Sequence, residues 1–297
     1  MHLEPVFFIK YEFWFNYLQV LKQRNVPVYL ISGIFRKNQH FFKWYGSWFR
    51  KQLTTFEYFF LQNENSVELL NKIGYQNAVN TGDTRFDRVL QIMHQHKTYP
   101  IIEEFTQNSF TIVAGSTYVE DEMLLQHVLK KFQDSRQKVK LILAPHVVNE
   151  QRISEIQQLF TTNQTVRYSQ YQNRNQNDQL MLIDNIGMLA SLYSYATVAY
   201  IGGGLKNGIH NTLEAAVYGI PLVFGHNFHK FEEAKALVET QAAFVVNNKD
   251  ELNMIIQKLF NEPDFRQNAG LKAGNYVSSN MGAVNKILSF LESKKIV

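Results

Sequence analysis

Short apolar runs and amphipathic stretches alternate along the chain, beginning within its first ten residues. In the first third, the apolar runs predict strands at 6–9, 26–32, 58–62 and 77–80. Apolar side chains at helical spacing lie between these runs and predict helices at about 13–24, 39–53 and 64–73. This order of elements indicates a sheet whose strands are joined by helices.

A second and longer series follows a polar stretch at residues 86–108. Its apolar runs predict strands at 110–115, 139–145, 180–184, 197–203, 220–225 and 242–246. Its amphipathic stretches predict helices near 119–133, 149–160, 187–195, 211–218, 230–239, 250–260 and 263–293. Strands rich in Val and Ile that alternate with helices are typical of parallel sheets with helices on both faces.

The two series predict an α/β protein with two Rossmann-like, parallel-sheet domains. Six strands suffice for a complete domain of this kind, whereas the first series supplies four in under 90 residues. We therefore expect the first domain, residues 1–88, to be incomplete. The second domain is placed at 89–297, and its last helix could pack back on the first domain. The polar segment 163–179 is predicted to be a loop.

Composition and charge narrow the range of partners. Hydrophobic residues make up 45% of the chain and charged residues 19%, as in globular proteins, and Cys is absent, which excludes disulfides and thiolate metal sites. The net charge of +4 is uneven: residues 1–99 contain 12 Lys and Arg against 7 Asp and Glu, whereas the remainder contains 18 against 19. The basic excess predicts an anionic partner for the first third, either nucleic acid or a phospholipid surface.

Residues 34–51 concentrate that basic character, with five Lys or Arg, no acidic residue and seven aromatic residues. At helical spacing the aromatic face consists of Phe41, Phe42, Tyr45, Trp48 and Phe49. Such a face most often packs on a sheet. The flanking cations also fit a surface held against anionic lipid. The sequence leaves both interpretations open.

The segment 202–225 contains six glycines in 24 positions and follows the predicted strand 197–203. His210 or Asn211 can cap the helix that follows, and the amides of its first turn would face an anion. Glu214, about one turn further, is placed to accept hydrogen bonds from vicinal hydroxyls. A ribose beside a phosphate would satisfy both groups, which favours a nucleotide. A plain strand–turn–helix, with Glu214 completing a capping arrangement, explains the same pattern.

Three further turns follow predicted strands, and the carboxyl ends of parallel strands meet at one edge of a sheet. The turn at 115–117 could line a ligand crevice or simply cap the next helix. His146, after Pro145, is either a ligand group or a structural histidine. At Gly187 only the turn backbone is a binding candidate. No D-x-D motif occurs, and histidine pairs lack nearby carboxylates, so we expect no catalytic metal.

The first domain offers two candidates of its own. Glu12 directly follows a predicted strand, and its carboxylate is either a helix N-terminal charge or a site group. Arg85 lies at the domain junction between Asp83 and Asp87, where surface ion pairing is the simpler interpretation.

Taken in order, these motifs resemble one family. The motifs are "KYEFWFN" (10–16), "TGDTRFD" (81–87), "AGSTYVEDE" (114–122), "APH" with "NEQR" (144–152), "DNIGMLASLYSYATVAYIGGG" (184–204) and "GIHNTLEAAVYGIPLVFG" with "NFHKFEEA" (208–234). They are similar to those of the bacterial 3-deoxy-D-manno-octulosonic-acid (Kdo) transferases, GT-B glycosyltransferases that move Kdo from CMP-Kdo onto the lipid A precursor. The resemblance covers nearly the whole chain and is most specific at 197–233.

The resemblance implies roles for particular residues. The family's Pro-Arg pair, which holds CMP, falls on Pro145 and His146. Its Gly-Glu-Leu turn falls on 187–189, and its Asn-Pro-Leu-Glu helix start on 211–214. The candidate substrate-binding residues are therefore Gly115, Ser116, Thr117, Pro145, His146, Gly187, Met188, Leu189, Asn211, Thr212, Leu213 and Glu214. Glu12 and Arg85 match residues thought to support the transition state and are the candidate catalytic residues.

Four positions depart from the family pattern. His146 stands where the family has Arg, Met188 where it has Glu, and Thr212 where it has Pro. The first two departures change donor contacts. Arg85 replaces a Lys and keeps its charge.

The implied function is Kdo transfer from CMP-Kdo to the lipid A precursor (lipid IVA) in lipopolysaccharide biosynthesis, without a cofactor and without a nucleic-acid partner. The implied location is peripheral, at the cytoplasmic face of the inner membrane. The family's anchor segment and its G-S-x-G-E loop, which carries the general base, have no match upstream of Glu12. We therefore expect this chain alone to transfer Kdo poorly. The alternatives are another GT-B transferase, a sugar-nucleotide epimerase, or an inactive nucleotide-binding remnant.

Overall fold

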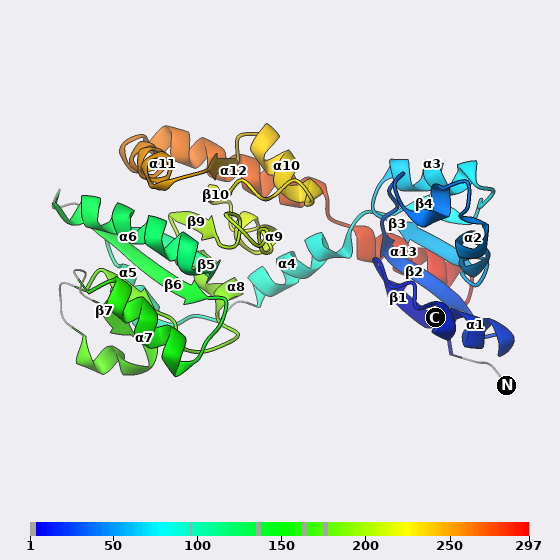
Figure 1. Cartoon of the computed structure of the whole chain (residues 1–297), viewed down its shortest axis with the longest axis horizontal. Helices are drawn as coiled ribbons and strands as arrows, with labels where there is room; N and C mark the ends of the chain where they lie inside the picture. Colours follow the sequence, from blue (N-terminus) through cyan, green and yellow to red (C-terminus); the bar gives the residue numbers. More distant parts are fainter. Residues whose placement is uncertain (1–3, 96, 135–137, 162–164, 175–177, 297) are drawn as a thin grey trace. The chain divides into compact units, whose positions relative to one another are not determined.

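The computed structural model describes residues 4–95, 97–134, 138–161, 165–174 and 178–296 (Figure 1). The chain divides into two compact units. Unit 1 contains Met1–Arg88 and Asn280–Val297, and unit 2 contains Val89–Ser279. Each unit is built on its own parallel sheet.

Unit 1 has a four-stranded sheet in the order β1-β2-β3-β4, with every pair parallel. Its strands are β1 (Val6–Ile9), β2 (Val28–Gly33), β3 (Tyr58–Leu61) and β4 (Ala78–Asn80). Its helices are α1 (Phe15–Gln23), the 3₁₀-helix η1 (His40–Phe42), α2 (Ser47–Leu53), α3 (Glu64–Lys72) and α13 (Ala283–Ser293). The buried side chains of Leu30, Phe35 and Phe59 lie in the main core of this unit.

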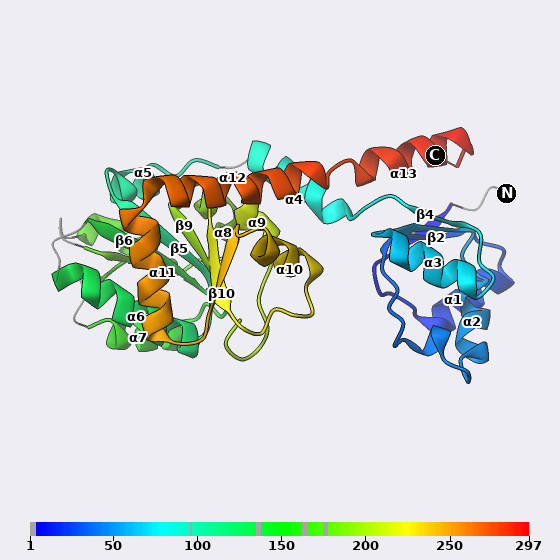
Figure 2. The same ribbon diagram turned by 90° about the horizontal axis from the view of Figure 1, so that it is seen from above.

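Helix α13 comes from the end of the chain but belongs to unit 1, where it lies along the sheet (Figure 2). Its Ile287 and Leu291 pack against Tyr29 and Phe60 of the sheet. A helix of this length is only marginally stable in isolation, so burial of its apolar face against the sheet supplies most of its stability.

A single carboxylate fixes the start of α13. Asp87 accepts hydrogen bonds from the amides of Gly282 and Val284, at 2.7 and 3.1 Å. These amides belong to the helix N-terminus, where backbone donors lack partners within the helix. Asp87 is therefore a capping residue for α13.

Unit 2 has a seven-stranded parallel sheet in the order β11-β10-β9-β5-β6-β8-β7. Its strands are β5 (Phe110–Thr117), β6 (Val139–Pro145), β7 (Thr165–Arg167), β8 (Leu180–Leu182), β9 (Val198–Ile201), β10 (Leu222–Gly225) and β11 (Ala243–Val246). Helix α4 (Thr84–His94) begins in unit 1 and ends in unit 2. The other helices are α5 (Pro100–Thr106), α6 (Val119–Asp134), α7 (Glu150–Leu159), the 3₁₀-helix η2 (Tyr168–Asn173), α8 (Leu189–Leu192), the 3₁₀-helix η3 (Tyr193–Tyr195), α9 (Leu213–Ala216), α10 (Glu232–Glu239), α11 (Lys249–Asn261) and α12 (Pro263–Ser279).

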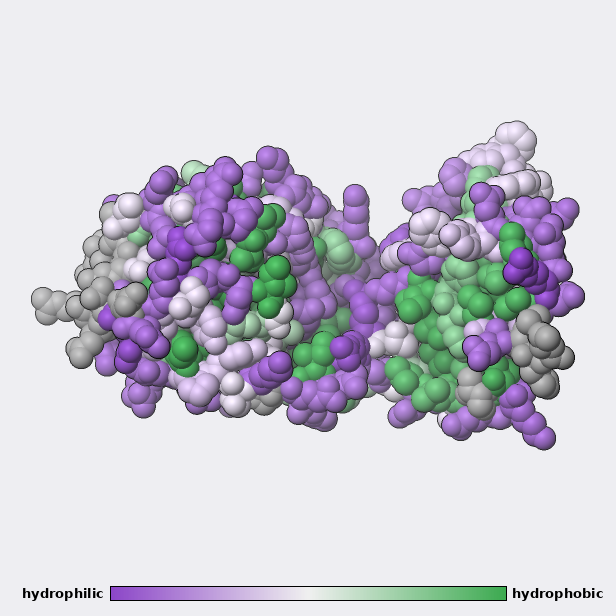
Figure 3. All heavy atoms as spheres, turned by 90° about the horizontal axis from the view of Figure 1, so that it is seen from below, coloured by the Kyte–Doolittle hydropathy of each residue, from purple (hydrophilic) through white to green (hydrophobic). Residues whose placement is uncertain are grey.

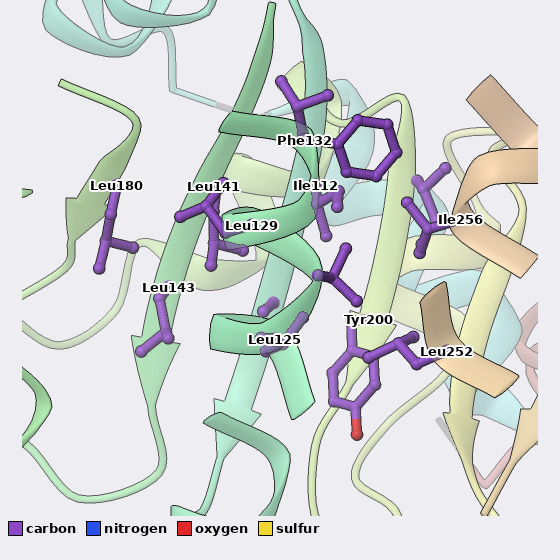
Figure 4. Close-up of a cluster of buried hydrophobic side chains, with 14 of the residues drawn as sticks. Ile112, Leu125, Leu129, Phe132, Leu141, Leu143, Leu180, Tyr200, Leu252 and Ile256 are labelled. Atoms are coloured by element: carbon purple, nitrogen blue, oxygen red, sulfur yellow. The ribbon is translucent and has the colours of Figure 1, made fainter. Parts of the chain in front are cut away.

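The main core of unit 2 lies between one face of this sheet and helices α6 and α11 (Figure 4). Leu125 and Leu129 of α6 and Ile256 of α11 meet Ile112 of β5 and Leu141 of β6 there. The packing of α6 and α11 against the central strands therefore fixes the positions of the carboxyl ends of these strands.

Several elements differ from the sequence-based expectation. Strand β7 and η2 occupy residues 165–173 of the segment 163–179, which was expected to be a loop. Residues 163–164 and 175–177 of that segment lie outside the described residues. The helix expected over 263–293 is two helices, separated around Gly282, whose φ is +97°. The helix expected over 211–218 is reduced to the four residues of α9.

Among the described residues, no helix is both long enough and apolar enough to cross a membrane.

Candidate functional site

The order of strands reverses beside β5, and ligands of open α/β sheets bind outside the carboxyl ends of the strands at such a point. β6 and β8 lie on one side of β5, and β9 and β10 lie on the other. β9 runs into residues 202–208, which we call the glycine loop. The candidate substrate-binding residues all lie at or after the ends of β5, β6, β8 and β9, within unit 2.

Gly202 allows close contact between the backbone at the end of β5 and the backbone that follows β9. A Cβ at Gly202 would lie 2.2 Å from the Ser116 carbonyl oxygen and 2.7 Å from the Thr117 Cα. The Gly202 amide donates to the Gly115 carbonyl at 2.9 Å, which continues the β5–β9 pairing. Contact with the protein's own backbone therefore requires a glycine here.

Asp121 of α6 ties the glycine loop to the end of β5. Its carboxylate accepts hydrogen bonds from the Tyr200 hydroxyl at 2.7 Å, the Gly203 amide at 2.8 Å and the Tyr118 amide at 2.9 Å. Figure 4 shows the Tyr200 hydroxyl directed away from the hydrophobic cluster. Burial raises the pKa of the Asp121 carboxyl, and the three hydrogen bonds oppose that rise. The sequence analysis missed this residue as an organiser of the site.

Its neighbour Glu122 is also buried and connects α6 to the end of β5 and to α7. Thr117 donates to one carboxylate oxygen at 3.0 Å, and Arg152 of α7 forms an ion pair with the other. Burial raises the pKa of the Glu122 carboxyl, and the Arg152 guanidinium acts in the opposite direction. Helical spacing carried a signal for both acids, since position 125, three or four residues later, is a core position of α6.

Glu214 and Asn211 form a hydrogen-bonded pair within the glycine-rich segment. The Asn211 amide nitrogen donates to Glu214 Oε1 at 2.9 Å, and Asn211 Oδ1 accepts from the Leu213 amide at 3.2 Å. Burial raises the pKa of the Glu214 carboxyl, and the Asn211 hydrogen bond lowers it. Asn211 thus positions one oxygen of Glu214 and at the same time occupies one of the amides at the start of α9.

The rings of Tyr118, His146 and His210 lie close together at the carboxyl edge of the sheet. The ring centroids of Tyr118 and His146 lie 4.8 Å apart, those of His146 and His210 4.7 Å apart, and those of Tyr118 and His210 5.8 Å apart. The His146 amide donates to the Thr117 carbonyl at 3.0 Å, which holds the turns after β5 and β6 together. The three rings come from separate loops, and Tyr118 was not a candidate in the sequence analysis.

The remaining candidates of unit 2 are placed mainly by packing. A Cβ at Gly115 would lie 2.1 Å from the Tyr193 hydroxyl and 2.7 Å from Leu189 Cδ1, so Gly115 makes room for these side chains. Pro145, Met188, Thr212 and Leu213 are buried as whole residues. Gly187 has a φ of +92°, as a tight turn requires.

Each of the two candidates of unit 1 contacts a residue two positions away in the sequence. Glu12 accepts a hydrogen bond from the Trp14 indole nitrogen. Arg85 contacts the buried Asp83 carboxylate through Nε at 2.8 Å and through Nη2 at 2.7 Å. This pairing is the ion pair that the sequence suggested, and it fixes the direction of the guanidinium.

Within the described parts of the chain, no group of three or more His, Asp or Glu side chains is arranged to hold a metal ion.

Comparison with known proteins identifies relatives for both units. The family model of the 3-deoxy-D-manno-octulosonic-acid transferases (kdotransferase) matches residues 1–88. A 3-deoxy-D-manno-octulosonic acid transferase of Rickettsia prowazekii is 27% identical over 71% of this chain and 46% of its own length. One of Haemophilus influenzae is 26% identical over 95% of this chain and 67% of its own length. This chain is similar to Kdo transferases over most of its length.

Solved structures agree on the fold. The C-terminal CMP-Kdo binding domain of WaaA from Acinetobacter baumannii is 21% identical and covers 65% of this chain and 97% of that domain, with a TM-score of 0.53. UDP-GlcNAc 2-epimerase from Neisseria meningitidis, bound to UDP-GlcNAc, covers 94% of this chain and 73% of its own, with 17% identity and a TM-score of 0.65. The resemblance and the GT-B type α/β fold are confirmed. The chain spans about half the length of the first curated Kdo transferases that it matches.

Proposed function

We propose that this chain is the donor-binding portion, with part of the acceptor domain, of a Kdo transferase. It moves Kdo from CMP-Kdo to the lipid A precursor, lipid IVA, in lipopolysaccharide biosynthesis. The observation that carries this proposal is the Asn211–Glu214 pair at the carboxyl edge of a sheet with the fold of a CMP-Kdo binding domain. The alternative donors, UDP-sugars, would be detected by a screen with UDP and CMP.

Glu214 is suited to hold a ribose. Asn211 donates a hydrogen bond to Oε1 of Glu214, which directs the carboxylate without saturating it. A carboxylate with remaining acceptor capacity binds two neighbouring hydroxyls well, because each donates a charge-assisted hydrogen bond. The half-buried setting strengthens these bonds by excluding water.

The reaction that we propose is direct displacement at the anomeric carbon by an acceptor hydroxyl, with inversion. A general base removes the hydroxyl proton, and positive charge stabilises the departing CMP phosphate. Arg85 is the proposed source of that charge, since its guanidinium is already oriented by Asp83. Glu12 is proposed to support the transition state from the same unit. No metal or other cofactor takes part in this scheme.

Glu214→Gln should weaken CMP binding by about tenfold or more, because a neutral amide replaces charge-assisted hydrogen bonds to the ribose. Calorimetry with CMP and with 2′-deoxy-CMP is the measurement. The wild-type chain should bind CMP more tightly than 2′-deoxy-CMP, and Glu214→Gln should show a much smaller difference between the two ligands.

Glu239→Gln is the matched control, because Glu239 is an exposed acid at the end of α10 in the same unit. Equal affinities of wild type and Glu214→Gln for CMP would remove Glu214 from the site. Absence of CMP binding by the wild-type chain, with tight binding of UDP, would favour a UDP-sugar enzyme.

We also propose that unit 1 binds an anionic membrane surface, which would place the protein peripherally at the cytoplasmic face of the inner membrane. In residues 34–51, Phe41 is buried in the core, whereas Trp44 is 93% and Trp48 55% exposed. Lys43 and Lys51 flank these two tryptophans. Figure 3 shows hydrophobic residues on one face of this unit. Exposed Trp with nearby Lys is typical of interfacial binding.

Trp44→Ala combined with Trp48→Ala should reduce binding to vesicles of phosphatidylcholine with phosphatidylglycerol by about tenfold. Co-sedimentation measures the bound fraction, and Leu271→Ala is the control, since Leu271 is a 58% exposed apolar residue of unit 2. Neutral phosphatidylcholine vesicles should bind the wild type more weakly. Equal binding to both vesicle types, or to wild type and double variant, would contradict the proposal.

A further inference from the structure

A groove follows β11, the strand at one end of the sheet of unit 2. Among the described residues, no strand pairs with the outer side of β11. The groove has a volume of about 570 Å³, and all four residues of β11 line it. Successive side chains of a strand point to opposite faces of the sheet. A groove that touches all four residues therefore runs along the edge of the strand and not over one face.

The backbone of β11 directs the polar groups of alternate residues away from β10. The Leu222 amide of β10 donates to the Ala242 carbonyl at 3.1 Å, and Leu222 is in register with Ala243. In a parallel ladder of this register, Phe244 exchanges hydrogen bonds with β10, whereas Ala243 and Val245 direct their amides and carbonyls outward. A further strand could pair with these outward groups.

The sequence of β11 does not protect this edge. Natural proteins protect exposed sheet edges with charged side chains, proline, bulges or very short strands. β11 has the sequence AFVV and a regular register with β10, so this described strand carries no charge, proline or bulge. The strand at the opposite end of the sheet, β7, has only three residues and ends in Arg167. The edge at β11 is therefore the better suited to pairing.

Helix α11 forms one wall of the groove. Glu251, Met254, Ile255 and Lys258 line the groove and recur at the spacing of one helical face. Met254 is 64% exposed. Glu251 and Lys258 are separated by about 10 Å along the helix axis. The wall therefore carries an acid at one end, a base at the other end and apolar side chains between them.

Both charged groups are held in place by contacts within unit 2. The Asn247 amide donates to the Glu251 carboxylate at 2.9 Å, and this hydrogen bond lowers the pKa of Glu251. Lys258 Nζ lies 4.1 Å from the ring centroid of Phe265, a residue of α12 that also lines the groove. The groove therefore presents a carboxylate and an ammonium group at defined positions.

We infer that this groove is the interface of a two-fold symmetric dimer, in which β11 pairs antiparallel with β11 of a second copy of the chain. A two-fold axis brings the same surface of both copies together and reverses its direction. Glu251 of each copy then faces Lys258 of the partner subunit. This self-complementary arrangement of charge favours a second copy over an unrelated peptide. The inference is independent of the proposed donor site.

The outward backbone groups define the register of the pairing. With Phe244 at the two-fold axis, Ala243 lies opposite Val245 of the partner subunit. Such residues form the hydrogen-bonded pairs of an antiparallel ladder. The same axis places Met254 close to its own copy, because Met254 lies between Glu251 and Lys258 on α11. An antiparallel strand at the edge of a parallel sheet is common, so the combined sheet has ordinary geometry.

The first test is sedimentation equilibrium of the whole chain between about 1 and 100 μM, where the wild type should form dimers. Met254→Asp should raise the dimer dissociation constant about tenfold or more, because it places like charges together at the axis. The variant should fold normally, since Met254 is exposed. Leu271→Asp is the matched control, because Leu271 is 58% exposed on α12 and does not line the groove.

Charge reversal tests whether the two charged groups meet across the interface. Glu251→Lys alone and Lys258→Glu alone should each weaken dimerisation. An equimolar mixture of the two single variants should restore it, because each contact in the mixed dimer then joins opposite charges. Circular dichroism checks the fold of Glu251→Lys, since Glu251 also accepts from Asn247. If this variant unfolds, Met254→Asp still decides the question.

Hydrogen–deuterium exchange locates the interface in the wild type. The amides of Ala243 and Val245 should exchange more slowly at about 100 μM than at about 1 μM protein. A wild type that stays monomeric at the higher concentration would overturn the inference. So would a dimer that Met254→Asp and the charge reversals leave unchanged, because its interface would lie elsewhere. None of these outcomes depends on CMP binding, so the proposed function is tested separately.

Discussion

Gly202→Ala should destabilise unit 2 by about 3 kcal/mol or more. The added Cβ would lie 2.2 Å from the Ser116 carbonyl oxygen and 2.7 Å from the Thr117 Cα, and both are backbone atoms that cannot rotate away. Overpacking of a core costs about 1–3 kcal/mol, and contacts with fixed backbone belong to the upper end of that range. The strands β5 and β9 would have to separate at the proposed donor site.

The position of the tryptophans allows the unfolding of unit 1 to be followed separately from that of unit 2. All three, Trp14, Trp44 and Trp48, belong to unit 1. In urea unfolding, the circular-dichroism transition should shift to lower urea for Gly202→Ala, while most of the tryptophan-fluorescence transition stays in place. CMP affinity of the variant should also fall.

Gly274→Ala is the matched control and should have the opposite sign. Gly274 lies within α12, and its added Cβ would meet Gly219 Cα at 3.4 Å, an ordinary van der Waals distance. Alanine is favoured over glycine in a helix by about 1 kcal/mol or less. An equal loss of stability in both variants would show that the contact at Gly202 is not what matters.

Much of the fold could be predicted from the chain itself. Central strands of a parallel sheet are buried on both faces, so runs such as those of β9 and β10 are continuously apolar and easily recognised. The edge strand β7 was not predicted, because its three residues, Thr165–Arg167, pair through the backbone and show no apolar run. Strand pairing of this kind leaves little trace in a single sequence.

The end of the chain was harder to interpret. Residues 263–293 show one continuous helical pattern, yet Gly282 and the Asp87 cap divide it into α12 and α13. The cap comes from a residue far away in sequence, so no local pattern could indicate it. Asp87 itself suggested only surface ion pairing.

The site was predictable in its location but not in its internal contacts. Parallel strands bring their carboxyl ends together, and this was enough to gather the loops after β5, β6, β8 and β9. The partners of each residue depend on side-chain directions in three dimensions. Asp121 is the clearest case, because an acid in the first turn of a helix suggests only an interaction with the helix dipole.

Asp121→Ala should also cost unit 2 about 3 kcal/mol or more. It would leave the Tyr200 hydroxyl and the Gly203 and Tyr118 amides without their acceptor, and each unsatisfied buried donor costs about 1–3 kcal/mol. The Gly203 amide would then no longer hold the glycine loop against α6, so CMP affinity should fall together with stability. Urea unfolding followed by circular dichroism measures the first effect and calorimetry the second.

The adjacent acid provides the control. Glu120 forms an ion pair with Lys206 at 3.2 Å, and their side chains are 41% and 71% exposed, so Glu120→Ala should cost less than about 1 kcal/mol. The pH dependence of stability provides a second test that distinguishes Asp121 from Glu120. Its folded-state pKa is raised, so the folded protein binds more protons than the unfolded chain, and wild-type stability should decline as the pH rises from the unfolded value through the folded one.

Asp121→Ala should lack the part of this decline that Asp121 contributes, while Glu122, whose pKa is also raised, retains its own. The variant would therefore be less stable at every pH, but its stability should decline less steeply than that of the wild type as the pH rises above about 4, the ordinary carboxyl pKa. A slope equal to that of the wild type would show that Asp121 keeps an ordinary pKa in the folded state. An unchanged stability at pH 7 would mean that the three donors find other acceptors, and the glycine loop would then need another anchor.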